Sequence, residues 1–297
     1  MRISVQTFVT GQEREPMAEF IAGVAKALEE RGVAGVWMAE HVVTFDRYDA
    51  AYKYPYADDG TPPEVMNHVG MIEPLTGLAA MAMCSTSLRL GTGIAILPQR
   101  NPLYFAKQGA VVDRLSNGRF LAGLGVGWSA QEFAATGTPF EHRGSRMRDY
   151  IQVVRTLWAD ERSSFEGRFY TLPECKHEPK PIQRPHPPFY FGGESEAALR
   201  RVAEFGQGWF SMRLTPAEIG ARLTILSDML AEHGRTLGEI DLVTGPADLP
   251  CNADTLAAYA ELGVNEVSGI CFGDSLDNYL RTADQVLTQL VEPAQKL

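Results

Sequence analysis

The apolar residues of this sequence switch repeatedly between the two-residue spacing of strands and the spacing of about 3.6 residues that is typical of helices. Residues 3–8 alternate as a strand does. Behind Pro16, a residue that suits a first helical turn, apolar residues from Met17 to Leu28 recur at helical spacing. Residues 33–39 then form a second predicted strand. The chain therefore begins with one strand–helix unit and continues into another.

The same alternation continues along the chain and predicts eight such units. Predicted strands cover residues 3–8, 33–39, 88–97, 119–126, 189–191, 209–212, 241–244 and 264–272. Predicted helices cover residues 16–32, 73–83, 103–115, 141–158, 194–205, 216–233, 254–262 and 276–291. Eight alternating units with short turns favour a closed (β/α)8 barrel, and a doubly wound sheet with a second domain is the alternative. Because the alternation resumes directly after the proline-rich residues 179–188, we expect residues 1–297 to form one domain.

Two insertions interrupt this pattern. The sequence FEGRFYTL around Gly167 has the pattern of a small hairpin. After the second predicted strand comes a long polar and aromatic stretch containing Tyr48, Tyr52, Tyr54 and Tyr56. Such a stretch is too long for a plain connection, so it forms either a lid over a hydrophobic substrate or surface packing under a long loop.

Composition excludes several classes of protein. Lys and Arg total 27 against 37 Asp and Glu, so the net charge of −10 and the pI near 5.2 oppose binding to nucleic acid. The four cysteines form no CxxC motif, and we interpret them as reduced thiols. No uninterrupted apolar stretch is long enough to span a bilayer, and the amino terminus lacks the apolar region of an export signal. We therefore expect a cytoplasmic protein without a membrane partner.

In a barrel of this kind, catalytic groups lie at the C-terminal ends of the strands. Glu40 and His41 close the second predicted strand, which is a suitable position for an acid/base pair. A histidine that is merely hydrogen-bonded at the barrel rim would look the same. The other histidines have no metal-ligand spacing, so we predict no metal, and no GxSxG motif supports covalent hydrolysis.

Glycines mark two further strand ends. Gly192 and Gly193 close the fifth predicted strand, and Ser195 begins the helix that follows. Unhindered N–H groups at a helix N-terminus suit a phosphate, although Ser195 could equally act only as a helix cap. The sequence GLGVG at 123–127 lacks the GxGxxG spacing of a dinucleotide loop. Either its glycines only weaken the end of the strand, or they allow the backbone to approach a flat ligand closely.

Four longer segments carry a family resemblance. They are MAEH at 38–41, RLGTGIAILPQRNPLYFAKQGAVVDRLSNGRFLAGLGVGW at 89–128, PKPIQRPHPPFYFGGES at 179–195 and ALRRVAEFGQGW at 198–209. Together they resemble the luciferase-like monooxygenase superfamily of flavin- and deazaflavin-dependent enzymes. Within it, the chain is most similar to the subgroup that depends on coenzyme F420.

The resemblance implies a (β/α)8 barrel of the bacterial luciferase-like type with insertions, a homodimer, and a cofactor ring at the C-terminal face. It implies a non-prolyl cis peptide between Gly93 and Ile94 behind the ring, and His41, beside Glu40, as the substrate-positioning acid/base. Further cofactor contacts would come from two glycine-containing turns. The residues of these turns are Gly125, Val126, Gly127, Trp128, Gly192, Gly193 and Ser195.

Three positions depart from related sequences. Trp128 stands where some sugar-phosphate-oxidising relatives carry a carboxylate, and Phe45 stands where they carry tryptophan. We therefore expect a different substrate. Gln207 replaces the aspartate of a familiar Gly-Asp-Gly-Trp sequence, which weakens any prediction of cofactor anchoring there.

The chemistry that these features imply is hydride transfer, because a deazaflavin carries carbon instead of nitrogen at ring position five and forms no oxygen adduct. We predict an F420-dependent oxidoreductase acting on an apolar carbonyl, enone or alcohol. The alternatives are an FMN-dependent monooxygenase supplied by a separate reductase, a non-catalytic flavin- or deazaflavin-binding protein, and a cofactor-free barrel isomerase acting on phosphorylated substrates. The anionic tail of F420 would prefer a basic rim. Candidates for this rim are Arg100, Arg143, Arg146 and Lys180.

Overall fold

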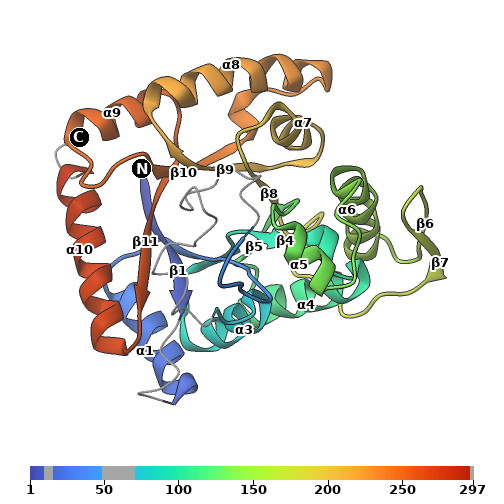
Figure 1. The fold of residues 1–297 in the computed structure, drawn as a ribbon, viewed down its shortest axis with the longest axis horizontal. Coiled ribbons are helices and arrows are strands. Elements are labelled where there is room, and N and C mark those ends of the chain that lie inside the picture. Colours follow the sequence, from blue (N-terminus) through green and yellow to red (C-terminus); the bar gives the residue numbers. More distant parts are fainter. Residues whose placement is uncertain (10–15, 49–70, 295–297) are drawn as a thin grey trace.

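A computed structural model describes residues 1–9, 16–48 and 71–294. Within these ranges, eight parallel strands form a ring in which each strand pairs with two neighbours (Figure 1). In ring order they are β3 (Arg89–Thr92), β2 (Gly35–Met38), β1 (Arg2–Val9), β11 (Glu266–Gly273), β10 (Asp241–Pro246), β9 (Gly208–Leu214), β8 (Phe189–Gly192) and β5 (Phe120–Gly125). Pairing of β3 with β5 closes the ring. The predicted (β/α)8 barrel is confirmed, and the doubly wound alternative is wrong.

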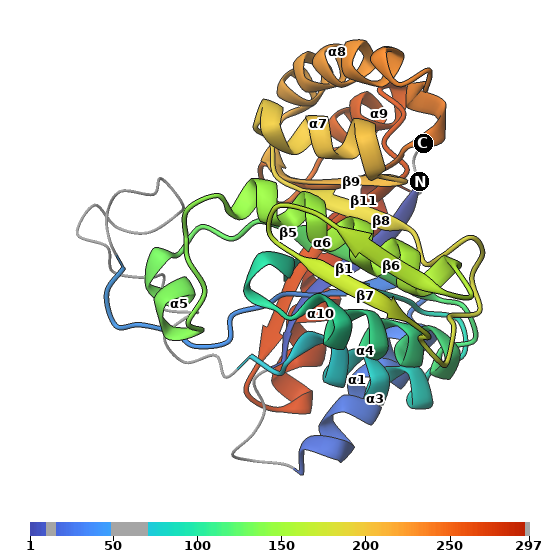
Figure 2. The same ribbon diagram turned by 90° about the vertical axis from the view of Figure 1, so that its right-hand side faces the viewer.

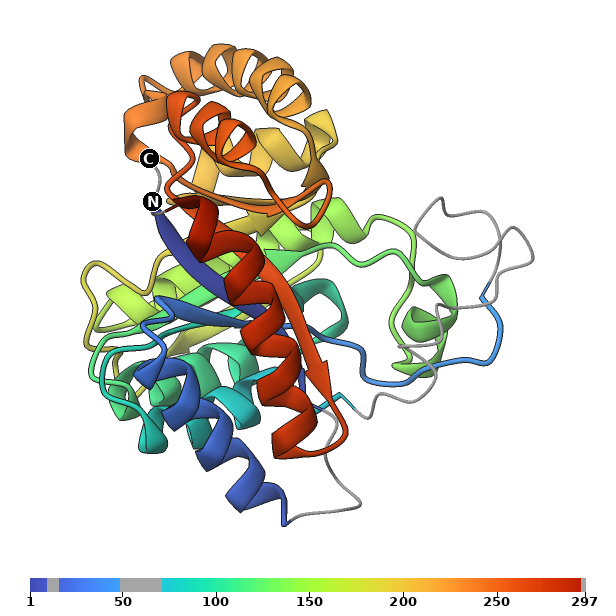
Figure 3. The same cartoon turned by 90° about the vertical axis from the view of Figure 1, so that its left-hand side faces the viewer.

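The helices lie around the outside of this ring (Figures 2 and 3). They are α1 (Met17–Glu30), α3 (Pro74–Cys84), α4 (Pro102–Leu115), α6 (Arg143–Ala159), α7 (Glu196–Phe205), α8 (Pro216–Glu232), α9 (Ala253–Glu261) and α10 (Leu276–Ala294). The short helix α5 (Ala130–Ala135) lies apart from them in the connection after β5, and single 3-10 turns cover Leu97–Gln99 and Leu237–Glu239. The helices of the outer layer pack on the barrel. Their apolar faces pack on the outward side chains of the strands. In α1 the residues that produced the helical spacing, including Phe20, Val24 and Leu28, are buried against the barrel.

The structure departs from the predicted elements in two places. The third predicted strand, 88–97, is divided at Gly93, and its second part is the short strand β4 (Ala95–Ile96), which pairs with β5. Helix α5 was not predicted. The hairpin around Gly167 is confirmed as β6 (Ser163–Glu166) paired with β7 (Thr171–Cys175) in antiparallel orientation.

Charged side chains fill the N-terminal end of the barrel. Glu266 is almost completely buried and accepts hydrogen bonds from Arg89 at 2.5 Å and from the Trp37 indole at 2.7 Å. Asp241 accepts from the Tyr190 hydroxyl at 2.7 Å. Three further contacts join these groups: Arg2 donates to Glu266 and Asp241, and Arg89 donates to Asp241. Because every buried charge has a partner of opposite sign, this layer closes one end of the barrel without an unpaired charge.

An apolar layer lies above the charged one. Its members come from five different strands and form a cluster separate from the core between strands and helices: Trp37, Leu121, Tyr190, Phe210 and Val243. Trp37 packs edge-on against Tyr190 and tilted against Phe210, with ring centroids 5.2 and 5.0 Å apart. The interior is therefore filled at the N-terminal end and through its middle.

Replacing Glu266 by glutamine tests the charged layer. The change leaves Arg89 beside a neutral amide in a buried site, so we expect Glu266→Gln to lower the free energy of unfolding by about 3 kcal/mol. The matched control is Glu174→Gln, which removes the surface ion pair with Arg162 and should cost less than about 1 kcal/mol. Urea unfolding followed by circular dichroism measures both. Equal losses in the two variants would contradict this account of the barrel end.

A buried histidine makes the stability of the fold depend on pH. His177 is buried, and neither of its ring nitrogens makes a hydrogen bond. Burial, reinforced by the nearby Lys107 and Lys180, lowers the pKa of His177 from 6.5 to about 4. Between these two values the unfolded chain binds a proton that the folded chain does not. Stability contributed by neutral His177 is therefore present above pH 6.5 and is lost as the pH falls toward 4.

We expect His177→Phe to flatten the fall in stability below neutral pH, by up to about 3 kcal/mol between pH 7 and pH 4. His233→Phe is the control, because His233 is exposed, and it should leave the slope unchanged. Chemical unfolding at a series of pH values provides the measurement. An unaltered slope in the His177 variant would show that another group causes the acid sensitivity.

Candidate active site at the C-terminal end of the barrel

At the C-terminal end of the barrel, the residues that the structure describes leave interior side chains exposed, in contrast to the filled N-terminal end. On β11, Gly269 approaches α10 so closely that a Cβ there would lie 2.1 Å from a methyl carbon of Val286. Residues alternate along a strand, so Ile270 and Phe272 face the interior instead. They are 39% and 41% exposed among the described residues. Two large apolar side chains thus line a mouth that the described part of the chain leaves uncovered.

Beside this mouth, glycines allow a close approach of the backbone and of Ile94. The Gly93–Ile94 peptide bond is cis, as the family resemblance implied. The Gly93 carbonyl accepts a hydrogen bond from the Gln6 side chain at 2.6 Å. A Cβ at Gly125 would lie 2.0 Å from Ile94 Cδ1, and one at Gly192 would lie 2.8 Å from the same atom. The structure thus brings Ile94, Gly125 and Gly192 together, because only glycine leaves space for that side chain.

A histidine–carboxylate pair lies at the same end. His41 Nδ1 lies 3.0 Å from Glu132 Oε2, and the Val42 backbone N–H donates to Glu132 Oε1 at 2.7 Å. The Glu132 side chain is 3% exposed and that of His41 is 13% exposed. Since the carboxylate only accepts in these contacts, His41 Nδ1 carries the hydrogen. His41 Nε2 makes no hydrogen bond within the described part of the chain.

Glu132 was missed by the sequence analysis because it lies on the unpredicted helix α5. Ser129 caps this helix by accepting from the Glu132 backbone N–H at 3.2 Å. The Ser-x-x-Glu spacing is typical of a helix N-terminus and could have predicted it. In this helix, however, the glutamate side chain turns to His41 and Val42. Figures 2 and 3 show α5 beside the segment that follows β2.

Aromatic side chains surround the pair. The Trp128 ring lies edge-on to His41 with centroids 5.8 Å apart, and Tyr48 packs on Trp128 at 5.0 Å. Phe45 packs edge-on against Tyr48 at 5.5 Å. Trp128 and His41, two predicted site residues, are therefore brought together. The remaining aromatic residues of the predicted lid, Tyr52, Tyr54 and Tyr56, lie outside the described residues.

Glu40 is bound elsewhere. Its carboxylate accepts from the Ile96 backbone N–H at 2.5 Å and forms an ion pair with Arg100, which also contacts Glu73 at 2.6 Å. The carboxylate partner of His41 is consequently Glu132 and not its sequence neighbour Glu40. In this geometry Glu40 holds β4 against the end of β2.

The predicted phosphate turn follows β8. Gly193 has a φ of +104°, a conformation that favours glycine, and its carbonyl accepts from the Trp209 indole at 2.9 Å. The Ser195 hydroxyl accepts from the Ala198 N–H at 3.3 Å, so Ser195 does cap α7. Glu194 accepts from the Met212 N–H at 3.0 Å, and burial raises the pKa of its carboxyl.

Of the four basic residues predicted for a rim, one adjoins the site. Arg143 donates to the carbonyl of Gly127, the positive-φ residue that follows β5 and Val126, at 3.1 Å. The other three bind protein groups elsewhere. Arg100 pairs with Glu40 and Glu73, Arg146 donates to the carbonyls of Pro139 and Glu141, and Lys180 donates to those of Leu157 and Asp160.

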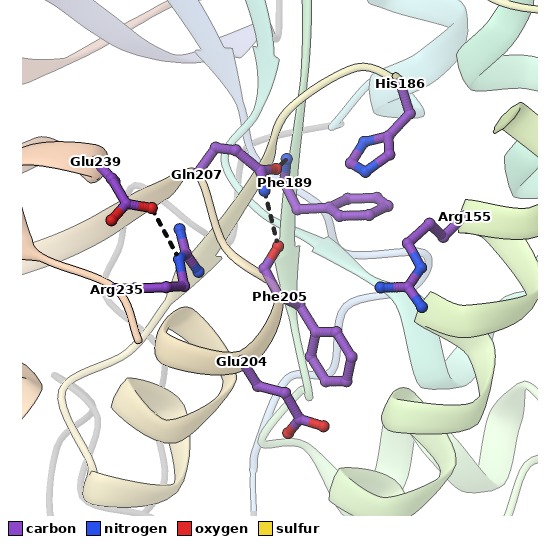
Figure 4. Close-up of a pocket in the computed structure, with 8 residues that line it drawn as sticks. All are labelled: Arg155, His186, Phe189, Glu204, Phe205, Gln207, Arg235 and Glu239. Carbon is purple, nitrogen blue, oxygen red and sulfur yellow. Dashed lines mark hydrogen bonds and ion pairs between the residues drawn. The ribbon is translucent and has the colours of Figure 1, made fainter. Parts of the chain in front are cut away.

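A cavity of about 390 Å³ lies at the opposite end of the barrel, outside the strands (Figure 4). Its lining includes Phe189, Gln207 and Arg235, which lie near the N-terminal ends of β8, β9 and β10. Gln207 accepts from the Phe189 N–H at 2.9 Å and donates to the Phe205 carbonyl at 3.1 Å. It therefore connects β8 to α7 far from the barrel mouth, so its replacement of aspartate does not bear on cofactor contacts.

Two features are absent from the part of the chain that the structure describes. No group of three or more His, Cys, Asp or Glu side chains is arranged to hold a metal ion. Among the described helices, none combines the length and apolarity needed to cross a membrane.

Solved structures share this fold. A monooxygenase from Streptomyces bottropensis superimposes with a TM-score of 0.74 over 98% of this chain and 99% of its own, at 19% identity. An F420-dependent secondary alcohol dehydrogenase, solved in complex with an F420–acetone adduct, gives a TM-score of 0.67 over 96% of this chain and 99% of its own, at 16% identity.

Sequence comparisons extend this likeness. An uncharacterized protein of Mycobacterium tuberculosis H37Rv is 30% identical over 249 residues, which cover 83% of this chain and 85% of the relative. An FMNH2-dependent dimethylsulfone monooxygenase of Pseudomonas putida is 36% identical over 160 residues, or 52% of this chain and 44% of that enzyme. A family model described as luciferase-like monooxygenase matches residues 1–267. With its closed barrel and this match, the chain belongs to the luciferase-like monooxygenase family.

Proposed function

We propose that this protein is an F420-dependent oxidoreductase that moves a hydride between the deazaflavin and an apolar carbonyl, enone or alcohol. The observation that carries the proposal is the His41–Glu132 pair, whose contact at 3.0 Å leaves Nε2 without a partner in the described chain. A hydride transfer to or from a carbon–oxygen bond needs a group that gives or takes one proton at the oxygen. His41 Nε2 is suited to that task.

The residues around the mouth fit a planar cofactor. A bulge of Gly93 and Ile94 faces the glycines Gly125 and Gly192, where added Cβ atoms would collide with Ile94. The exposed side chains of Ile270 and Phe272 provide apolar surface in the same opening. We propose that Gly93, Ile94 and residues 125–128 contact the ring and that Gly192, Gly193 and Ser195 contact its phosphate. When bound, the deazaflavin would supply the hydride donor or acceptor.

Glu132 determines which ring nitrogen of His41 can exchange a proton with the substrate. Its carboxylate keeps the hydrogen of neutral His41 on Nδ1, so the lone pair is on Nε2 and can accept a proton from a substrate hydroxyl. In the reverse direction, protonated His41 donates from Nε2 to a carbonyl oxygen. The carboxylate stabilises the imidazolium formed in between, as a buried acceptor does for other catalytic histidines. Trp128, packed against the ring edge, restricts the ring to this orientation.

An FMN-dependent monooxygenase is the second candidate, and the similarity to the FMNH2-dependent enzyme of Pseudomonas putida favours it. A cofactor-binding protein without turnover is the third. The three candidates differ in which cofactor binds and in whether substrate is converted.

Titration with F420 and with FMN, followed by tryptophan fluorescence, separates the candidates. We expect the protein to bind F420 at least about tenfold more tightly than FMN, because the proposed site contacts the longer anionic chain of F420. Anaerobic mixing with reduced F420 and a series of enones and ketones should then restore the visible absorbance of the oxidised cofactor. Tight binding of FMN, together with oxygen consumption and no anaerobic turnover, would overturn the proposal in favour of the monooxygenase.

Substitutions of the pair test the proton-transfer role. We expect His41→Ala to lower kcat by about 10²–10⁴ while leaving the Kd for F420 nearly unchanged. Glu132→Ala should lower kcat by about 10–100-fold, because the ring loses its orientation and its preferred tautomer. Nitrogen-15 NMR of histidine-labelled protein should show the Nδ1–H tautomer of His41 in the wild type and a mixture in Glu132→Ala.

The control is Glu161→Ala, which changes an exposed carboxylate remote from the pair. If Glu132→Ala reduces kcat no more than this control does, Glu132 has no role in orienting His41. A loss of folding in Glu132→Ala is recognised by circular dichroism, in which case Glu132→Gln, which keeps one of the two hydrogen bonds, replaces it.

A further inference from the structure

Arg201 is a buried cation without a counter-charge. It lies on α7 and is 8% exposed. Within the described part of the chain its guanidinium makes no hydrogen bond and no ion pair, although an arginine carries five donors. The other arginine that is buried to this extent among the described residues, Arg146, donates to protein oxygens. None of the nitrogens of Arg201 is among the enclosed side-chain atoms that lack a hydrogen bond in the described part of the chain, so the guanidinium reaches open space from which an anion can approach.

The charged side chains that act most strongly on Arg201 are themselves positive. Burial and, after it, the nearby Arg143 and Arg148 lower the pKa of Arg201 to about 10. Arg148 is paired with Glu204, which is thereby occupied. Arg143 donates to the Gly127 carbonyl and lies over the Phe140 ring at 3.8 Å. Three positive side chains thus gather between α6 and α7, and Glu204 of α7 is paired with one of them, Arg148.

There is space beside the guanidinium. Gly144 is in the first turn of α6, and a Cβ built on it would find a single heavy atom within 4 Å, namely Arg201 Nη1 at 3.8 Å. The residue that precedes this helix, His142, provides no side-chain hydrogen bond to the first turn. A helix N-terminus without a side-chain cap presents N–H groups and a partial positive charge. Arg201 and this first turn therefore face the same space, and both favour an anion.

We propose that Arg201 and the first turn of α6 form an anion subsite that binds a phosphate or carboxylate group. The hydrogen bond from Arg143 to Gly127 joins this turn to the loop after β5, which borders the barrel mouth. A charged chain attached to a ring in the mouth can reach the subsite from there. This last identification rests on the proposed function. The subsite itself rests only on Arg201, Gly144 and the uncapped helix.

Thermal unfolding of the full-length protein without cofactor tests the subsite directly. Inorganic phosphate is added at constant ionic strength, with sodium chloride as the reference. We expect the wild-type Tm to rise with phosphate, since a ligand bound only to the folded state stabilises it. Arg201→Met should show no such rise, because the guanidinium that would bind the anion has been removed.

The matched control is Arg200→Met, which removes an exposed arginine from the neighbouring position of the same helix. It should respond to phosphate as the wild type does. A second variant, Gly144→Glu, places a carboxylate beside the guanidinium. We expect it to raise the Tm and to abolish the phosphate response. An unchanged response in Arg201→Met, or a wild type that does not respond, would overturn the proposal.

Two pairs of ligands identify the source of the anion. Riboflavin differs from FMN by the phosphate, and F420 with a short tail differs from F420 with a long tail in its carboxylates. If the phosphate occupies the subsite, Arg201→Met should reduce the preference for FMN over riboflavin by about tenfold or more. If a tail carboxylate occupies it, Arg201→Met should remove only the difference in affinity between F420 with a long tail and F420 with a short tail. Failure of turnover with F420 would overturn the proposed function but would leave the phosphate response as the test of the subsite.

Discussion

Buried ion pairs close the N-terminal end of the barrel. Arg2, Arg89, Asp241 and Glu266 come from four strands, and their side chains fill the space that the eight strands enclose at this end. Each charge is paired with one of opposite sign, so burial leaves none uncompensated. Aromatic side chains form the next layer. With that end closed and the middle packed, any free volume inside the barrel lies at the C-terminal end, which is where the candidate active site is found.

Close approach between glycine and larger side chains determines the form of that end. Ile94 lies where Cβ atoms of Gly125 and Gly192 would otherwise be, so the backbone of three strands can converge on one side chain. On the other side, β2 continues directly to His41, and a short helix supplies Glu132. The site therefore combines a wall contributed by strands with His41, the proposed acid/base group, whose orientation comes from a connecting segment.

Much of the fold was predictable because it follows from local periodicity. The eight strands, the buried apolar face of α1 and the hairpin around Gly167 all lie where the sequence pattern predicted them. The division of the third strand and the helix α5 did not follow from periodicity, because each depends on contacts with distant residues. The site was predicted in part. The structure brings the predicted residues His41 and Trp128 together, but Glu40 was paired with His41 on the basis of adjacency, whereas its carboxylate binds Arg100 and the Ile96 backbone.

The order of the residues is enough to predict the alternation of strands and helices, the glycines at the strand ends and the position of His41 directly after a strand. Which charges meet depends on the folded chain. Glu132 is 91 residues from His41 in the sequence, and Arg201 is far in sequence from the Gly144 that it faces. Such partners are set by the closure of the barrel, because strand pairing and helix packing, and not sequence spacing, bring remote side chains within hydrogen-bond distance or leave them without a counter-charge.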